Sequence, residues 1–545
     1  MLNIYKASAG SGKTYKLAGE FITEAFKDLT AFSRILAVTF TNKAAGEMKE
    51  RIIKELDNLS ESLPSGYMTE ISKKYNISEK EVALRAKNIR GAILHNYSDF
   101  NLKTIDSFVQ RVLRSFCYDI NINSGFSTQT DEASVLSDLT DILFKCADED
   151  TYLKKQMLLM AEKNIKDGEN WNFRVQVENI AKLIFTEKYK EFEAQQNLMK
   201  EKGMSEAEKK SYFDISAELI NSVYDNYIEK AREISSRAKT VIETELCGLT
   251  LSDMGTTIKN CCNFLLNKLE DAEVSATAYK MQQKDNWLPS KATKIQKEII
   301  PSLKEKLLPV LNEAVSFIED NAADFITAKL IRKDFGAFVL IGEIAKLLPE
   351  YRKENRVIMI SDASAFLDGI IAENDAPFIY ERTGNKFDHI FIDEFQDTSP
   401  FQWNNFRPLI ENSVAQGFDN LIVGDVKQAI YRFRGGDWSL LGGRVQEQIS
   451  DENIKVNSLD VNWRSRKNIV DFNNAVFQKS VETLINHGDK DLPLDFEILK
   501  KIYSDSFQKL PPGKNRSGGK VEVLFFEEEN PEEGAEEEVG FKEKP

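Results

Sequence analysis

Residues 7–14 read Ala-Ser-Ala-Gly-Ser-Gly-Lys-Thr, a loop of small residues that ends in a lysine and a threonine. A short extended run, residues 2–5, precedes this loop, and residues 15–28 follow it with apolar side chains at helical spacing. Residues 34–40 are then rich in β-branched and other apolar residues, which indicates a second strand. A strand, a loop, a helix and a returning parallel strand form the unit of an α/β fold. We therefore expect an α/β fold built on a parallel sheet.

The loop has the composition of a phosphate-binding site. Backbone N–H groups of a glycine-rich loop that opens a helix point inward and can bind phosphate oxygens. Lys13 would reach the β- and γ-phosphates, and the Thr14 hydroxyl would coordinate Mg²⁺. Ala7 replaces the usual first glycine, and an ordinary glycine turn is the alternative interpretation. We expect ATP and Mg²⁺ as ligands, with the nucleotide held by Ala9, Gly10, Ser11, Gly12, Lys13 and Thr14.

A second motif closes the apolar run at residues 389–393, where Asp393 is followed directly by Glu394. In a phosphate-loop fold, an aspartate at a strand end can hold the Mg²⁺ that bridges the terminal phosphates. A neighbouring glutamate can orient and deprotonate the attacking water. This pair of acids favours ATP hydrolysis over transfer of the phosphoryl group to a small acceptor. The alternative is a charged loop at a strand end with no catalytic role.

A third segment, residues 423–436, reads V-G-D-V-K-Q-A-I-Y-R-F-R-G-G. The amide of Gln428 can sense a phosphate, while Tyr431, Phe433 and the neighbouring arginines can stack on bases and bind a phosphate backbone. Taken alone, the segment is better explained as an aromatic core with a basic exposed face. The pattern therefore permits nucleic-acid binding without establishing it.

The character of the sequence changes along the chain. Residues 121–350 contain seven glycines and four prolines, and their apolar residues recur every three or four positions, which predicts a mostly helical insertion. The α/β pattern resumes in residues 351–450 and continues through residues 451–526, where residues 456–461 and 521–526 are expected as strands. The glutamate-rich residues 527–545 are expected to form a solvated acidic linker or tail.

The charge balance is acidic but uneven. The 545 residues include 72 basic and 87 acidic side chains, for a net charge of −15. Residues 522–545 contribute −8 of this charge through ten glutamates and two lysines, which leaves −7 for the rest. Such a balance argues against a protein that coats nucleic acid non-specifically, yet it permits a local basic groove.

The placement of cysteines and histidines argues against a disulfide-stabilised protein and against a metal cluster. The five cysteines are scattered without a CxxC pair, which argues against a disulfide framework or zinc ribbon and favours a reducing cytoplasm. The histidines, His95, His389 and His487, are too dispersed to predict a metal cluster. No run of about 18 apolar residues and no secretory signal occurs, so we expect a cytoplasmic protein without a membrane span.

Five segments together resemble the UvrD/Rep-type superfamily 1 DNA helicases. The match rests on their order and spacing along the chain. The lead-in K-A-S-A-G at residues 6–10 and T-I-D-S-F at residues 104–108 are closer to the RecB/AddA helicase–nuclease branch than to the short repair helicases. The five segments are A-S-A-G-S-G-K-T (7–14), V-T-F-T-N-K-A-A-G-E-M (38–48), D-E-F-Q-D (393–397), G-D-V-K-Q-A-I-Y-R-F-R-G (424–435) and N-W-R-S (462–465).

The resemblance implies a role for several residues at the nucleotide. Gln428 resembles the residue that senses the γ-phosphate and couples hydrolysis to DNA. Arg464 resembles the arginine of the second motor domain that touches the γ-phosphate across the cleft. Trp463 stands where the family usually has a tyrosine that packs on the adenine. Together with Asp393 and Glu394, Gln428 and Arg464 make up the expected catalytic set.

The resemblance also implies contacts to single-stranded DNA. Phe40 would stack on a base, while Thr39 and Asn42 would bind phosphate. Tyr431 and Phe433 lie in the segment that lines the DNA track. Core packing is the alternative explanation for the phenylalanines at these positions.

The resemblance further implies how the domains are arranged. We expect a RecA-like P-loop domain, a large helical insertion and the start of a second RecA-like domain. The corresponding ranges are 1–120 and 351–450 for the first motor domain, 121–350 for the insertion, 451–526 for the incomplete second domain and 527–545 for the tail.

Some family segments are not found. The upstream glutamine motif, the T-x-H-x-x-K-G segment and the final V-A-x-T-R-A segment with its second arginine do not occur, and no nuclease pattern follows. We therefore expect this chain to be the N-terminal portion of a longer protein.

The implied function is ATP-driven 3′-to-5′ movement on single-stranded DNA and unwinding of duplex ends in DNA repair or recombination. A helicase–nuclease subunit is the candidate protein partner that the resemblance implies. The alternatives are an ATP- and DNA-binding module without turnover and a phosphate-loop kinase or transporter-type ATPase.

Overall fold

The computed structural model describes residues 1–116, 126–129, 131–166, 168, 170–201, 206–246, 250–289, 292–373, 386–487, 496–513 and 516–524. The chain forms two compact units. One is built from residues 1–121 and 362–545, and the other from residues 122–361. The acidic residues 527–545 lie outside the described residues.

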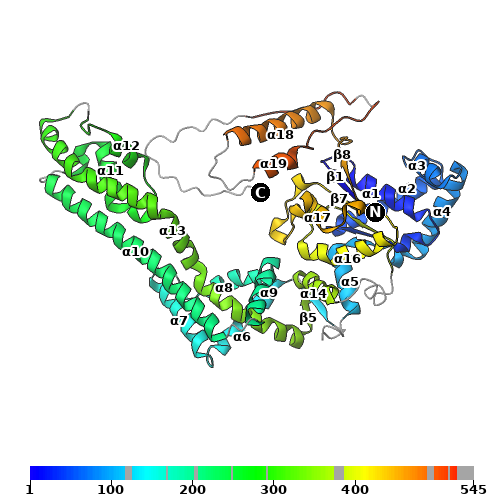
Figure 1. The fold of residues 1–545 in the computed structure, drawn as a ribbon, viewed down its shortest axis with the longest axis horizontal. Helices are drawn as coiled ribbons and strands as arrows, with labels where there is room; N and C mark the ends of the chain where they lie inside the picture. The colour runs from blue at the N-terminus through cyan, green and yellow to red at the C-terminus, as the bar shows by residue number, and fades with distance from the viewer. Residues whose placement is uncertain are drawn as a thin grey trace. The chain divides into compact units, whose positions relative to one another are not determined.

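A six-stranded parallel sheet forms the centre of the first unit (Figure 1). Its strand order is β3-β2-β6-β7-β1-β8, and all neighbouring strands run parallel. β2, β6 and β7 are buried at every residue, as expected for strands that are covered on both faces. This sheet confirms the predicted α/β fold. The strands are β1 (Leu2–Ala7), β2 (Ile35–Thr39), β3 (Leu102–Thr104), β6 (His389–Ile392), β7 (Asn420–Gly424) and β8 (Ile454–Leu459).

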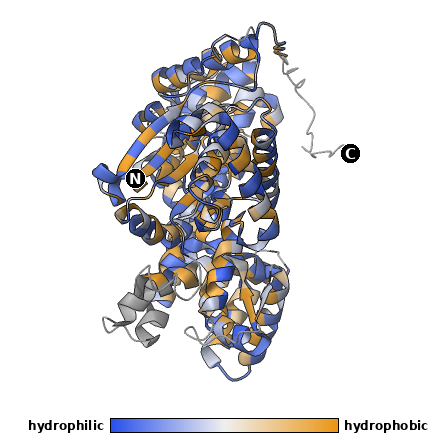
Figure 2. Cartoon of the chain, turned by 90° about the vertical axis from the view of Figure 1, so that its right-hand side faces the viewer, coloured by the Kyte–Doolittle hydropathy of each residue, from blue (hydrophilic) through white to orange (hydrophobic). Residues whose placement is uncertain are grey.

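Helices cover both faces of this sheet because alternate residues of a strand point to opposite sides. Leu36 and Val38 of β2 belong to a core that includes α5, α14 and α16. Ile35 and Ala37 belong to a second core that includes α1, α2, α3 and α4. In Figure 2 the hydrophobic colour gathers on the strands and the hydrophilic colour on the outward sides of many helices. The helices are α1 (Lys13–Ala25), α2 (Asn42–Ser60), α3 (Met68–Tyr75), α4 (Glu79–His95), α5 (Ile105–Ser115), α14 (Ile360–Glu373), α16 (Pro400–Ala415) and α17 (Val445–Gln448).

Residues 451–526 are predicted to begin a second motor domain, but their first strand extends the first sheet. β8 pairs with β1 along its whole length, from Leu2 opposite Ile454 to Ala7 opposite Leu459. Two helices follow, α18 (Lys467–His487) and α19 (Phe496–Tyr503).

The strand expected at residues 521–526 is not seen in its described part. Residues 521–524 have no strand partner in the described chain, and the side chains of Val523 and Leu524 are 55% and 69% exposed. A β-rich run without a neighbouring strand to receive its hydrogen bonds does not form a strand by itself.

The second unit is mostly helical, in agreement with the pattern of residues 121–350. Two long helices, α10 and α13, pack against each other (Figure 1). A short parallel pair, β4 (Ser127–Gln129) and β5 (Val357–Met359), joins the two ends of the unit. The helices are α6 (Glu132–Cys146), α7 (Thr151–Lys166), α8 (Arg174–Ala181), α9 (Glu187–Glu201), α10 (Glu206–Leu246), α11 (Thr256–Asn267), α12 (Ala276–Gln283) and α13 (Lys294–Asn355).

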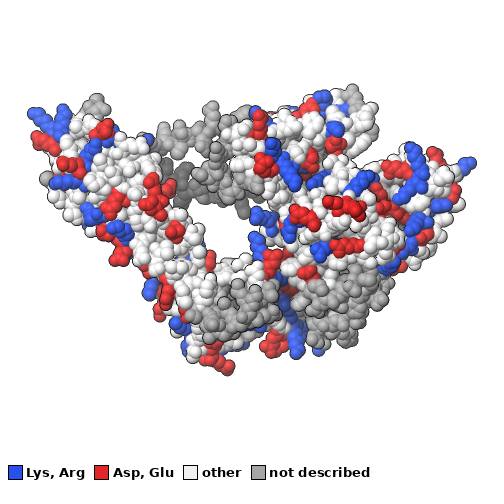
Figure 3. Space-filling model, viewed as in Figure 1, with Lys and Arg blue, Asp and Glu red and all other residues white. Residues whose placement is uncertain are grey.

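The exposed surface carries charges of both signs. Figure 3 shows lysines and arginines interspersed with aspartates and glutamates on the face in view. Many charged side chains of the described residues form ion pairs, such as Arg174 with Glu178 at 2.8 Å. Within the described residues, no helix is both long enough and apolar enough to cross a membrane.

The packing of α1 against Tyr67 predicts opposite effects for two glycine substitutions. A Cβ at Gly19 would lie 2.5 Å from Cε1 of Tyr67, whose side chain is buried. Gly19→Ala should therefore lower the free energy of unfolding by about 1–3 kcal/mol. Gly46→Ala is the matched control, because Gly46 lies on an exposed part of α2 with open space around its Cβ position. It should raise that free energy by up to about 1 kcal/mol. Urea denaturation measures both, and a loss of equal size in the two variants would contradict the packing.

Candidate functional site: a phosphate loop and its polar neighbours

The loop between β1 and α1 has the backbone of an anion site. Gly10 and Gly12 have φ angles of +77° and +88°, a left-handed conformation that glycine adopts at little cost. Gly12 is the N-cap residue of α1, whose first turn carries no acidic side chain. The hydroxyl of Ser11 is buried and has no hydrogen-bond partner. An unpaired buried hydroxyl beside a positive helix end fits a bound phosphate.

Lys13 points from the start of α1 to the acidic end of β6. Its Nζ donates a hydrogen bond to Oε2 of Glu394 at 2.6 Å, across 381 residues of sequence. Asp393, directly before Glu394, has a side chain that is only 3% exposed. Burial, with a further contribution from the charge of Glu394, raises the pKa of Asp393 to about 6, while the charge of Lys13 lowers it. Two carboxylates and an ammonium therefore share one small volume.

Glu394 stands at a strained turn of the chain. Its φ of +51° is uncommon for a residue with a side chain. The backbone N–H of Glu394 donates to Oδ1 of Asp393 at 3.0 Å, and the amide of Gln396 donates to Oε2 of Glu394 at 2.9 Å. These contacts fix both carboxylates at the end of β6.

The donor set suits Mg²⁺ and a triphosphate. Mg²⁺ prefers oxygen ligands and keeps several waters, so one carboxylate and one hydroxyl with phosphate oxygens suffice. Thr14 at the start of α1 and the buried Asp393 could supply these two oxygens, and the loop could supply backbone N–H groups. Within the described residues, no group of three or more His, Cys, Asp or Glu side chains gathers to hold a metal ion by itself.

The network continues from β6 to the end of β7. Oε1 of Gln396 accepts a hydrogen bond from the backbone N–H of Asp425 at 2.9 Å. Oδ2 of Asp425 accepts one from the amide of Gln428 at 2.6 Å. A Cβ on Gly424 would lie 2.7 Å from Oε1 of Gln396, so this contact requires glycine there. Gln428 is thus joined to Glu394 through two intervening residues.

The N-W-R-S segment lies directly on the phosphate loop. The backbone N–H of Trp463 donates to the carbonyl of Gly10 at 2.8 Å. A Cβ on Gly10 would meet Oδ1 of Asn462 and Cβ of Arg464, each at 2.9 Å. Gly10 is therefore required both for its φ and for this close approach. The side chain of Arg464 itself is exposed.

Sequence reasoning missed Gln508, which also holds the loop. Its amide donates to the carbonyl of Ala9 at 2.7 Å, and its Oε1 accepts from Asn462 at 2.7 Å. Asn474 fixes Gln508 in turn through two hydrogen bonds to its backbone. No local motif marks a lone glutamine that acts on a loop 499 residues away.

Tyr15 was also missed. Tyr15 and Trp463 both lie within 4 Å of a Cβ built on Gly12, and their side chains are 45% and 47% exposed. Tyr15 stacks on Tyr67 with ring centroids 4.6 Å apart. Its position directly after the Lys-Thr pair is the one signal that could have indicated it.

The predicted DNA contacts separate into two groups. Phe40, Tyr431 and Phe433 form a row, with ring centroids 4.7 Å and 5.9 Å apart, and Phe433 is 77% exposed. Asn42 is exposed at the start of α2. Thr39 lies apart from them, because its side chain is fully buried and its hydroxyl donates to the carbonyl of Thr41.

The sequence that forms this site matches a family of known proteins. The family model of the UvrD/REP helicase N-terminal domain matches residues 3–446. The chain belongs to this helicase family. The match confirms the resemblance seen in the sequence and the RecA-like P-loop fold. It spans β1 to β7 and ends before the N-W-R-S segment that lies on the phosphate loop.

Curated relatives confirm the helicase–nuclease branch. A subunit of an ATP-dependent helicase/nuclease from Lactococcus lactis subsp. lactis (strain IL1403) is 25% identical over 506 residues, 87% of this chain and 38% of that protein. The protein of the same name from Pediococcus pentosaceus is 24% identical over 93% of this chain and 40% of its own length. An exonuclease/helicase subunit, RexA, of Lactococcus lactis subsp. cremoris (strain MG1363) is 25% identical over 87% of this chain and 38% of its own length. The chain spans 38 to 40% of the length of these three relatives.

The raised pKa of Asp393 predicts how stability depends on pH. The folded protein holds this proton up to about pH 6, whereas the ordinary pKa of the group is 3.8. The buried charge therefore costs stability above pH 6, and the cost disappears as pH falls toward 4. Without metal, Asp393→Asn should unfold with a free energy about 1–3 kcal/mol higher at pH 8, and this gain should shrink toward pH 4. Urea denaturation between pH 4 and 8 checks this, and a gain independent of pH would contradict it.

Proposed function

We propose that this chain is the N-terminal motor portion of an ATP-dependent DNA helicase. It would couple ATP hydrolysis to 3′-to-5′ movement on single-stranded DNA and to the unwinding of duplex ends in repair or recombination. The observation that carries the proposal is the contact of Lys13 with Glu394 beside the buried Asp393, because it unites the two halves of an ATP site. Family membership and the names of the relatives support it.

Each residue at the phosphate loop has a proposed task. The loop from Ala9 to Gly12 binds phosphate through its N–H groups, and Lys13 neutralises the β- and γ-phosphates. Thr14 and Asp393 hold Mg²⁺, which draws charge from the phosphates when it is bound. Glu394 accepts the proton of the attacking water.

The remaining residues connect this site to the base and to DNA. Gln428 senses the γ-phosphate and Arg464 contacts it from the opposite side, since both lie in segments tied to the site. Trp463 packs on the adenine, with Tyr15 close by.

Single-stranded DNA would run along the aromatic row. Phe433 and Tyr431 offer faces on which bases of any sequence can stack. The guanidinium of Arg434 lies 5.6 Å from the ring centroid of Tyr431 and 5.8 Å from that of Phe433, and is placed to bind the backbone. Phe40 extends the row, and Asn42 would bind phosphate. Thr39 would contact the DNA phosphate through its backbone, because its hydroxyl is buried.

The names of the relatives support one wider proposal. Because they are called subunits of a helicase/nuclease, we propose that the intact protein acts with a protein partner. We also propose a cytoplasmic location, where DNA and ATP are both available.

A second candidate function is ATP and DNA binding without turnover. It is favoured by the contacts of Glu394, whose Oε2 accepts hydrogen bonds from both Lys13 and Gln396. A general base held in this way cannot take a proton from water until Lys13 moves to a phosphate.

The steady-state ATPase rate with Mg²⁺, with and without single-stranded DNA, tests the proposal. A rate that rises with DNA and is lost in Lys13→Ala supports a coupled motor site. Binding of ATP without turnover would favour the second candidate. A rate indifferent to DNA would overturn the helicase proposal and revive the kinase or transporter alternative.

The exposed ring of Phe433 predicts a selective loss of DNA affinity. Phe433→Ala removes a stacking face at little cost to stability, because the side chain is 77% exposed. Affinity for single-stranded DNA should fall about tenfold, since stacking on one aromatic contributes about 1–3 kcal/mol. Fluorescence anisotropy with a labelled oligonucleotide measures it. Phe472→Ala, at an exposed position of α18, should leave the affinity unchanged. Equal losses in the two variants would argue against the aromatic row.

A further inference from the structure

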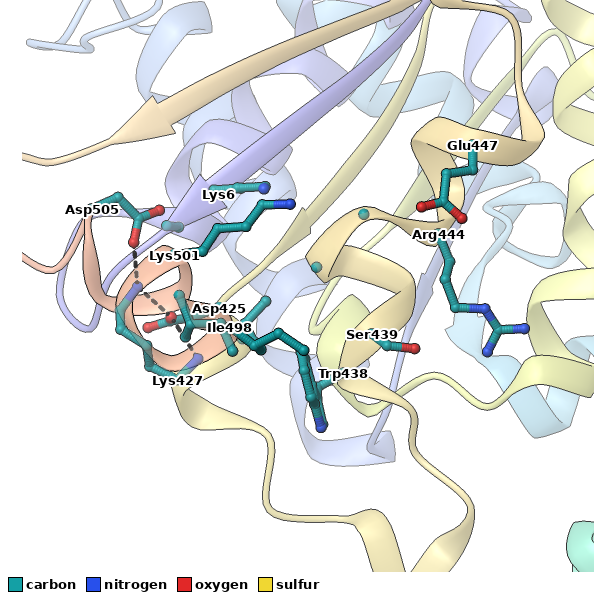
Figure 4. A pocket seen from close by; sticks show the side chains of 15 residues that line it. Lys6, Asp425, Lys427, Trp438, Ser439, Arg444, Glu447, Ile498, Lys501 and Asp505 are labelled. Carbon is teal, nitrogen blue, oxygen red and sulfur yellow. Dashed lines mark hydrogen bonds and ion pairs between the residues drawn. The ribbon is translucent and has the colours of Figure 1, made fainter. Parts of the chain in front are cut away.

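Lys427 lies between two aspartates that come from distant parts of the first unit. Its Nζ is 3.0 Å from Oδ1 of Asp425 at the end of β7 and 3.0 Å from Oδ1 of Asp505, just after α19 (Figure 4). The side chains of Lys427 and Asp425 are 15% and 2% exposed, so solvent screens their attraction weakly. Burial lowers the pKa of Lys427, but the two aspartates raise it above its ordinary value. The ammonium therefore stays charged and holds both carboxylates.

This ion-pair bridge is continuous with the phosphate-binding residues. Asp425 donates its backbone N–H to Gln396, and Gln396 donates its amide to Glu394, which accepts from Lys13. Every step is a hydrogen bond or ion pair between 2.6 and 3.0 Å. The other oxygen of Asp425 accepts from Gln428. Asp505 is thus at the far end of a polar chain that begins at Lys13.

Packing holds α19 only weakly, which makes the bridge important for its position. None of the residues of α19 is buried. A cavity of about 220 Å³ is lined by Ile498 and Ile502 of α19 and by Trp438 and Gly442 of the motor domain. Where apolar contact is incomplete, one ion pair can decide how two elements sit.

We propose that Asp505 is a positioning residue which couples α19 to the ATP site through Lys427 and Asp425. When the triphosphate draws Lys13 away from Glu394, the freed carboxylate changes the hydrogen bond of Gln396. The change passes to Asp425 and Gln428 and, through Lys427, to α19. The inference rests on the proposed function, because it names how that site is coupled to the segment after β8.

Two variants of Asp505 test this coupling in the full chain. Asp505→Asn should lower the kcat of the DNA-stimulated ATPase about tenfold and change the KM for ATP less than about twofold, because the phosphate loop is untouched. Asp505→Glu keeps the charge and should restore most of the rate.

Asp460→Asn is the matched control. It removes the ion pair of Asp460 with Lys509, which also ties the segment after α19 to the end of β8. This variant should keep the wild-type kcat. Equal losses in Asp460→Asn and Asp505→Asn, or wild-type kcat in Asp505→Asn, would overturn the proposal.

Amide hydrogen exchange separates this inference from the proposed function. A non-hydrolysable ATP analogue should slow exchange in α19 in the wild type and in Asp460→Asn, but not in Asp505→Asn. This result requires no turnover, so it holds if the chain only binds ATP. An equal response in all three proteins would overturn the coupling, whereas an absent wild-type ATPase with a normal exchange response would overturn only the motor function.

Discussion

The adjacency of three parallel strands is the constraint on which the site depends. β6, β7 and β1 are neighbours in the sheet, and parallel strands place their carboxyl ends at one edge. Lys13 follows β1, Asp393 follows β6 and Asp425 follows β7, so all three meet there. Lys13 and Glu394, which are 381 positions apart in the sequence, are brought together because β7 pairs with both of its neighbours.

Burial sets the chemistry at this edge. Asp393 is nearly inaccessible to water and has a raised pKa, which marks a charge that the protein alone does not satisfy. Lys13 forms its ion pair with Glu394 rather than with Asp393, and the amide of Gln396 donates a hydrogen bond to the same carboxylate of Glu394. A divalent cation would neutralise Asp393, and a triphosphate would pair with the ammonium of Lys13. The same hydrogen-bond and ion-pair network reaches Asp505, so a change in the contacts of Glu394 can alter the contacts of Asp505.

Glycines are required at two places for a reason that differs from loop flexibility. Gly10 lets the N-W-R-S segment approach the phosphate loop, and Gly424 lets Gln396 approach β7. In both cases a methyl group would meet a polar side chain at 2.7–2.9 Å. Close contact between polar segments, rather than apolar packing, thus joins the parts of the site.

The sequence by itself determined the parallel α/β fold, the helical insertion and the family. Phosphate loops, strand-end acids and helical periodicity are local patterns, and their physics acts within a few residues. The same motifs predicted that Lys13, Asp393 and Glu394 serve one nucleotide, but the direct contact of Lys13 with Glu394 is seen only in the structure. Only the tertiary structure decided that β8 joins the first sheet, that Thr39 is buried, and that Gln508 and Asp505 reach the site. These facts depend on strand pairing and on single side chains across hundreds of residues, and no local pattern encodes such distances.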